Sequence, residues 1–128
     1  MPIKSFRGKV ADEGTDTISL HTNTGSKGYR IKKFEIITAA PGTVSSELVC
    51  KIFTIPQTGT PTGTIDFSDN TLLGVAYYAD RTTNEGSDSN IIFDNMTFNQ
   101  DIYVTAVDVS ASSDTNYYIE LEQVKLAL

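Results

Sequence analysis

Two segments of this chain carry apolar residues on both alternating sets of positions, so neither fits a strand with one face in water. They span residues 48–55 and 102–107. Neighbouring side chains of a strand point to opposite faces, so a segment of this kind must be covered on both. Both alternating sets in the second segment are largely apolar: Ile102, Val104, Ala106 and Tyr103, Thr105, Val107. The two segments therefore predict central strands of a packed sheet.

A shorter apolar segment, residues 91–93, precedes residues 102–107 across a polar corner. We expect these two segments to form the pair of strands around which the other strands are arranged. Apolar alternation predicts further strands at residues 5–10, 17–21, 29–38, 72–79 and 117–128. Turn signals such as residues 12–14, 23–28 and 41–42 separate them, and polar loops are expected at residues 57–70 and 80–90.

Two of these segments change parity part-way along. The apolar residues of 29–38 move to the opposite face near Lys32 and Lys33, and a β-bulge there would restore one apolar face. The same reasoning predicts a bulge near Glu122 and Gln123. The last segment also fits a C-terminal helix, because some of its apolar residues have helical spacing. We favour a strand, since residues 117–119 are Tyr-Tyr-Ile.

The fold class that follows is all-β, with eight or nine strands and turns about every ten residues, as in a β-sandwich or closed barrel. The 128 residues fit one domain, residues 1–128. Antiparallel strands in this number favour a β-sandwich of the jelly-roll type.

The chain contains one cysteine, Cys50, inside an apolar segment. It cannot form an internal disulfide, and we expect it to be buried. The first residues, MPIKSFRGKV, lack the apolar core of a signal peptide, and no segment has the length of a membrane helix. We therefore expect expression in a reducing cytoplasm and no contact with a membrane.

Catalytic and metal-binding patterns are weak. The only histidine, His21, falls on the face opposite Ile18 and Leu20, and no Gly-x-Ser-x-Gly motif is present. One histidine and one cysteine are too few for a zinc site. Loop carboxylates could hold calcium, but their spacing is not that of an EF-hand loop. We expect no enzyme activity, no metal and no cofactor.

The net charge of −6 is unevenly distributed. Residues 1–33 contain seven basic and three acidic residues, whereas residues 34–128 contain three basic and thirteen acidic ones. The densest basic cluster consists of Lys27, Arg30, Lys32 and Lys33. Such a cluster can bind nucleic acid, but the overall acidity argues against it; the cluster can instead orient the protein on an acidic partner.

Tyrosines provide a different possibility, because rings exposed on a sandwich can stack on sugars. The candidates are Tyr77, Tyr78, Tyr103, Tyr117 and Tyr118. Ordinary cross-strand packing on a half-buried sheet face explains the same residues.

Four segments resemble small virion structural proteins of marine tailed bacteriophages, of the capsid decoration or cement class. They are GYRIKKFEII (28–37), DFSDNTLLGVAYYAD (66–80), FDNMTFNQDIYVTAVD (93–108) and NYYIELEQVKLAL (116–128). The resemblance implies a compact β-rich protein, without catalytic residues, that binds the major capsid protein on the outside of the virion and strengthens the shell. It further implies self-association, with a homotrimer expected, after assembly in the host bacterial cytoplasm.

We therefore expect Lys27, Arg30, Lys32 and Lys33 to bind the partner, with the loop 57–70 as a second contact surface. The alternative is a carbohydrate-binding or receptor-binding β-sandwich of a phage fibre or lectin-like protein.

Overall fold

The computed structural model describes residues 3–20, 27–42, 45–80, 87–93 and 97–125. The strands in these residues are β1 (Ile3–Val10), β2 (Gly14–Ile18), β3 (Lys27–Thr38), β4 (Ser46–Phe53), β5 (Leu72–Asp80), β6 (Ser87–Ile92), β7 (Ile102–Asp108) and β8 (Thr115–Lys125). The described part of the chain contains no helix, and hence none long and apolar enough to cross a membrane.

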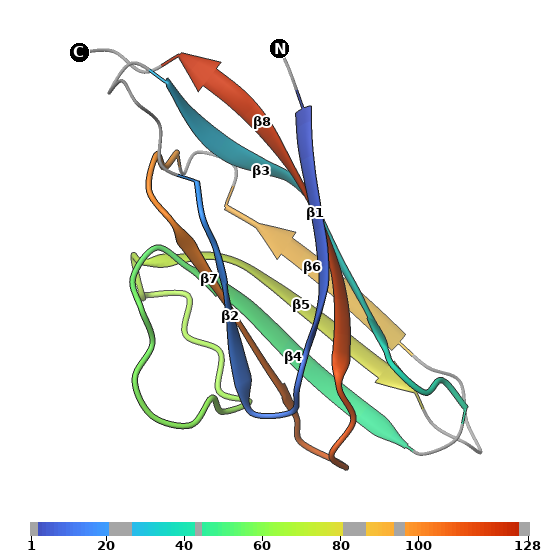
Figure 1. The fold of residues 1–128 in the computed structure, drawn as a ribbon. Coiled ribbons are helices and arrows are strands. Elements are labelled where there is room, and N and C mark those ends of the chain that lie inside the picture. The colour runs from blue at the N-terminus through green and yellow to red at the C-terminus, as the bar shows by residue number, and fades with distance from the viewer. Residues whose placement is uncertain (1–2, 21–26, 43–44, 81–86, 94–96, 126–128) are drawn as a thin grey trace.

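The strands form two antiparallel sheets that pack face to face (Figure 1). The small sheet has the order β1-β8-β3, and the large sheet has the order β2-β7-β4-β5-β6. The prediction of an all-β antiparallel sandwich is therefore confirmed, and so is the strand at the C-terminal segment as far as Lys125; residues 126–128 lie outside the described residues. The jelly-roll arrangement stays a prediction.

The strands with two apolar faces lie where the sequence indicated. β4 is between β7 and β5, and β7 is between β2 and β4. Every residue of β4 from Leu48 to Phe53 is buried, and β7 is buried throughout apart from Tyr103. These two strands are the centre of the large sheet.

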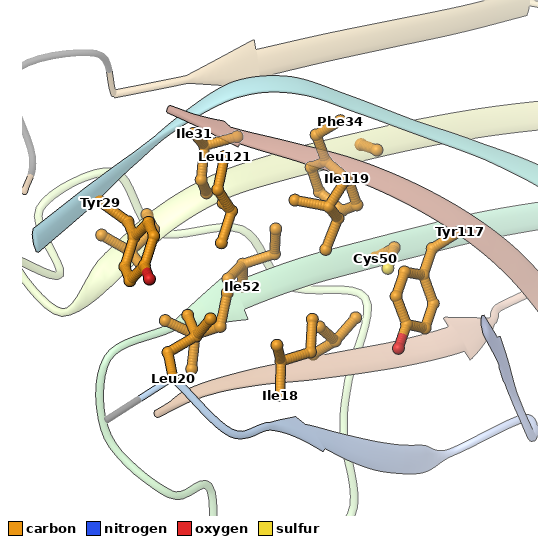
Figure 2. Close-up of a cluster of buried hydrophobic side chains, with 14 of the residues drawn as sticks. Ile18, Leu20, Tyr29, Ile31, Phe34, Cys50, Ile52, Tyr117, Ile119 and Leu121 are labelled. Carbon is orange, nitrogen blue, oxygen red and sulfur yellow. The ribbon is translucent and has the colours of Figure 1, made fainter. Parts of the chain in front are cut away.

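The core fills the space between the sheets. From the small sheet, Tyr117, Ile119 and Leu121 of β8 point toward β4 and β7 (Figure 2). Cys50 and Ile52 of β4 meet them, and both are fully buried. The predicted burial of Cys50 is confirmed, and the continuous apolar contact holds the two sheets together.

The bulge in β3 is confirmed. The register of β3 against β8 shifts between Ile31 and Lys33. Tyr29, Ile31 and Phe34 can therefore all be buried, although they differ in parity.

Three predictions are wrong. Residues 91–93 are not part of a central pair, because β6 is an edge strand of the large sheet and two strands separate it from β7. In agreement with this edge position, Ile91 is 42% exposed. Residues 87–90, expected in a loop, begin β6. β8 has no bulge near Glu122, since its register with β1 and β3 runs without a shift there; its last residues extend past the core, so they need not alternate.

A polar contact also crosses between the sheets. The Tyr117 hydroxyl of β8 donates to a carboxylate oxygen of Asp16 on β2, and Figure 2 shows the hydroxyl pointing toward that strand. Gly8 of β1 lies directly over the tyrosine, where a Cβ atom would come within 2.8 Å of the hydroxyl oxygen. Glycine at this position leaves the ring room to reach across.

Asp108, at the end of β7, organises the turn into β8. Its two carboxylate oxygens accept backbone N–H groups from Glu47, Ser110, Ala111 and Ser113 at 2.9–3.0 Å. Burial alone would raise the pKa of this carboxyl, but the four N–H groups outweigh burial and hold the pKa below its ordinary value.

We predict that Asp108→Ala lowers the free energy of unfolding by about 3 kcal/mol at pH 7, because four backbone donors lose a charged acceptor. A carboxyl whose pKa is lower in the folded state stabilises the fold fully at a pH above its pKa in the unfolded state. This stabilisation is lost as the pH falls through the pKa of the folded state. The difference between the wild-type protein and Asp108→Ala should therefore shrink from about pH 5 toward pH 2.

Urea unfolding at several pH values measures this difference. Asp114→Ala is the control, since among the described residues the Asp114 side chain accepts one long bond, from the Asp12 nitrogen at 3.3 Å. A difference that stays constant with pH would contradict the role given to the Asp108 charge.

Candidate functional site: the outer face of the small sheet

The outer face of the small sheet carries part of the basic cluster that the sequence singled out: Arg30 and Lys33 point outward, whereas Lys27 has the parity of the buried Tyr29. On β8, the inward residues Tyr117, Ile119 and Leu121 leave the alternate residues pointing away from the core. The strand register then places side chains of β1 and β3 beside them in rows. The rows are Lys9–Asn116–Ile37, Arg7–Tyr118–Glu35, Ser5–Glu120–Lys33 and Ile3–Glu122–Arg30.

These rows mix charges of both signs. Glu120 and Glu122 of β8 lie beside Lys33 and Arg30 of β3, so neighbouring side chains across these two strands attract one another. The outer face is therefore not a uniformly basic surface. Because β8 alternates regularly, Glu120 and Glu122 both lie on this face. The sequence pattern alone did not place Glu122 there, because it suggested a bulge at this point of the strand.

Arg30 forms an ion pair with Glu122. Its Nη2 lies 2.5 Å from Oε1 of Glu122, and its Nε donates to the same oxygen at 2.7 Å. This hydrogen bond holds the pKa of Glu122 below its ordinary value; the charges of Arg30 and Lys32 act in the same direction, and desolvation opposes them. Arg30 thus joins β3 to β8, which leaves it less available to a partner.

The three lysines of the cluster are exposed. Lys32 is at the bulge, close enough to Glu122 to influence it. Lys33 is 4.0 Å from Glu35, a long and exposed contact. Lys27 begins β3 opposite Lys125 of β8. We call Lys27, Lys32 and Lys33 the lysine edge, because β3 is an edge strand of the small sheet.

A hollow of about 640 Å³ opens beside these rows. Its lining comes from all three strands: Arg7, Gly8, Glu35, Ile36, Ile37, Asn116, Tyr117 and Tyr118. The Tyr118 hydroxyl donates to Glu120 Oε2 at 2.7 Å, which raises the pKa of the phenol. Since Glu120 lies two residues further along the same face, the ring of Tyr118 leans along the strand. An aromatic ring between charged and amide side chains is an arrangement that can hold a polar ring such as a sugar.

The other tyrosines are placed differently. Tyr117 is buried in the core, while Tyr77, Tyr78 and Tyr103 of the large sheet are half-buried. Of the five candidates, Tyr118 alone contributes an outward-facing ring to the hollow in the small sheet.

The loop expected at residues 57–70 is present between β4 and β5 and lies against the large sheet on the side away from β3 and β8 (Figure 1). The Thr54 nitrogen donates to the Thr71 carbonyl at 2.9 Å, which closes its base. Ile55, Ile65 and Phe67 are each at least 41% exposed, so the loop presents an apolar surface.

Residues considered for catalysis or metal binding have structural environments where they are described. Burial raises the pKa of the Cys50 thiol, so the thiol is protonated at neutral pH. Asp66 and Asp69 accept hydrogen bonds from Ser68 and Thr71 within turns. His21 lies outside the described residues, and among those described no three possible ligands gather to hold a metal ion.

Comparison with known proteins returned no match, either to a protein family or to a curated protein sequence.

The ion pair on this face gives a direct test of the rows. We predict that Arg30 and Glu122 are coupled, because their side chains form a close ion pair that is also hydrogen-bonded. A double-mutant cycle with Arg30→Gln and Glu122→Gln, followed by urea unfolding, measures the coupling. The pair Lys33 and Glu35, at 4.0 Å, is the matched control and should show less. Equal coupling in both pairs, or none in the first, contradicts the assigned geometry.

Proposed function

We propose that this chain is a non-enzymatic phage virion structural protein, a capsid decoration or cement protein that binds and stabilises the outer shell. The observation that carries the proposal is the lysine edge. Three exposed ammonium groups lie along one edge strand of a packed sandwich in a chain of net charge −6. Local positive charge on an acidic protein orients it toward an acidic surface.

The partner that we propose is the major capsid protein. The lysine edge meets acidic side chains of the shell, and Arg30 keeps β3 joined to β8 during docking. The two sheets share one apolar core, so a mechanical force applied to β3 is transmitted to the large sheet. A protein that strengthens a shell requires this property.

We assign the apolar loop surface of Ile55, Ile65 and Phe67 to contacts between copies of the chain. The loop lies against the large sheet, opposite the small sheet that carries the lysine edge. Self-association into the proposed trimer and binding to the shell can therefore occur together.

We predict that Lys27→Gln/Lys32→Gln/Lys33→Gln weakens binding to capsids of the encoding phage about tenfold at low salt, as expected for three rim charges. The salt dependence of binding should also flatten, because fewer exposed charges remain to be screened. Cosedimentation of the chain with capsids that lack it measures both effects.

The matched control is Thr15→Glu/Thr17→Glu/Ser19→Glu, which lowers the net charge by the same three units at exposed positions on or next to β2. The control should bind like the wild-type protein. If both triple variants lose affinity equally, net charge and not the lysine edge governs binding.

Carbohydrate binding is the second candidate, and the hollow beside Tyr118 favours it. Arg7, Glu35 and Asn116 surround the ring with hydrogen-bonding groups. In this function the chain would be a sugar-binding or receptor-binding module of a fibre.

We predict for this alternative that the chain binds surface polysaccharide of the host bacterium and that Tyr118→Ala removes the binding. Binding is lost because the ring provides the apolar face on which a sugar would stack. Tyr103→Ala, on the large sheet, is the control and should leave binding intact. A wild-type protein that does not bind in a polysaccharide pull-down eliminates this candidate.

A further inference from the structure

The loop between β4 and β5 encloses a second, polar pocket against the outer face of the large sheet. Its volume is about 200 Å³. Lys51 and Phe53 of β4 and Thr105 of β7 form its floor, and residues 57–62 of the loop form its walls. The pocket is on the opposite side of the large sheet from the core and does not involve the lysine edge.

Lys51 brings a positive charge into this pocket. The side chain is buried, with 8% of the residue exposed, and its Nζ donates to the Thr64 carbonyl at 2.7 Å. An ammonium group has three N–H donors, so two have no acceptor among the residues that the structure describes. Within the described chain no carboxylate lies at ion-pair distance from Nζ; Asp69 acts on it from further away.

The charge on Lys51 is therefore poorly compensated. Burial lowers the pKa of the amine, and Asp69 only partly opposes this effect. A buried charge is costly without a partner of opposite sign. Phe53, whose ring centroid is 5.8 Å from Nζ, is a weak partner.

Thr105 provides independent evidence that this pocket binds a ligand. It is 2% exposed, and its hydroxyl has no hydrogen-bond partner among the described residues. It stands directly opposite Lys51 in the pairing of β4 with β7, and it lines the same pocket. Buried hydroxyl groups in native proteins are nearly always paired.

The walls add donors of the same kind. Gln57 has an amide group, whose Nε2 also donates to the Ile55 carbonyl at 3.1 Å, and Thr58, Thr60 and Thr62 have hydroxyl groups. Among the residues that the structure describes, no carboxylate lines the pocket. We propose that this pocket binds a small tetrahedral oxyanion, such as phosphate or sulfate, between the Lys51 ammonium and the Thr105 hydroxyl. The bound anion fastens the loop to the large sheet, and the proposal holds whether or not the chain binds a capsid.

Isothermal titration of the full chain with inorganic phosphate tests the site. We expect saturable binding of one phosphate per chain and a rise in the unfolding midpoint with phosphate concentration. Thr105→Val, which keeps the shape and removes the hydroxyl, should weaken the affinity about tenfold, the effect of one hydrogen bond to a charged group. Lys51→Met should abolish binding.

Lys125→Met removes the same charge from the exposed end of β8 and is the matched control, which should bind phosphate like the wild-type protein. Thr105→Val without phosphate should be at least as stable as the wild-type protein, because it loses an unpaired polar atom. The weaker phosphate binding of Thr105→Val then cannot result from unfolding. This variant therefore tests the proposed site even if Lys51→Met does not fold. Absence of saturable binding, or wild-type affinity in Thr105→Val, overturns the proposal.

Discussion

The structure depends on one constraint, which is that β4 and β7 are buried on both faces. The small sheet covers the inner face, where Ile119 and Leu121 meet Cys50 and Ile52. The loop between β4 and β5 covers the outer face. It approaches so closely that a Cβ atom at Gly63 would come within 2.6 Å of the Val109 side chain. Covering the outer face with a loop is also what encloses Lys51 and Thr105.

This arrangement divides the surface into two parts with different properties. The loop presents apolar side chains over the large sheet, whereas the outer face of the small sheet presents rows of alternating charge. Arg30, in one of those rows, is paired with Glu122. The lysine edge, of which Lys33 belongs to the rows, remains exposed. The two surfaces point in opposite directions, which suits a protein that binds a shell on one side and other copies of itself elsewhere.

The fold was largely predictable from the sequence, because apolar alternation reports burial directly. The change of parity between Ile31 and Phe34 correctly indicated the bulge in β3. β6 was missed because Ser87–Ile92 starts with four polar residues, and an edge strand needs little apolar surface. The bulge expected in β8 was wrong, since the end of that strand extends past the core and its parity carries no information about burial.

The candidate site was less predictable than the fold. The sequence gathers Lys27, Arg30, Lys32 and Lys33, but only the pairing of β3 with β8 shows that Glu122 engages Arg30. Likewise, burial of Lys51 was implied by its place in an apolar strand, but the loop that covers it and the unpaired hydroxyl beside it come from tertiary structure. Contacts between segments that are distant in the sequence determine which charged side chains are free to bind a partner. The local sequence pattern does not reveal these contacts.

The most direct measurement of the proposed role is a cryo-electron microscopy map of the phage particle in which we propose that this chain is a component of the shell. The account predicts density for the sandwich on the outside of the shell, with the small sheet and its lysine edge against the major capsid protein and three copies around a local three-fold axis. A particle whose shell lacks this density, or a sandwich bound through its large sheet, would contradict the account.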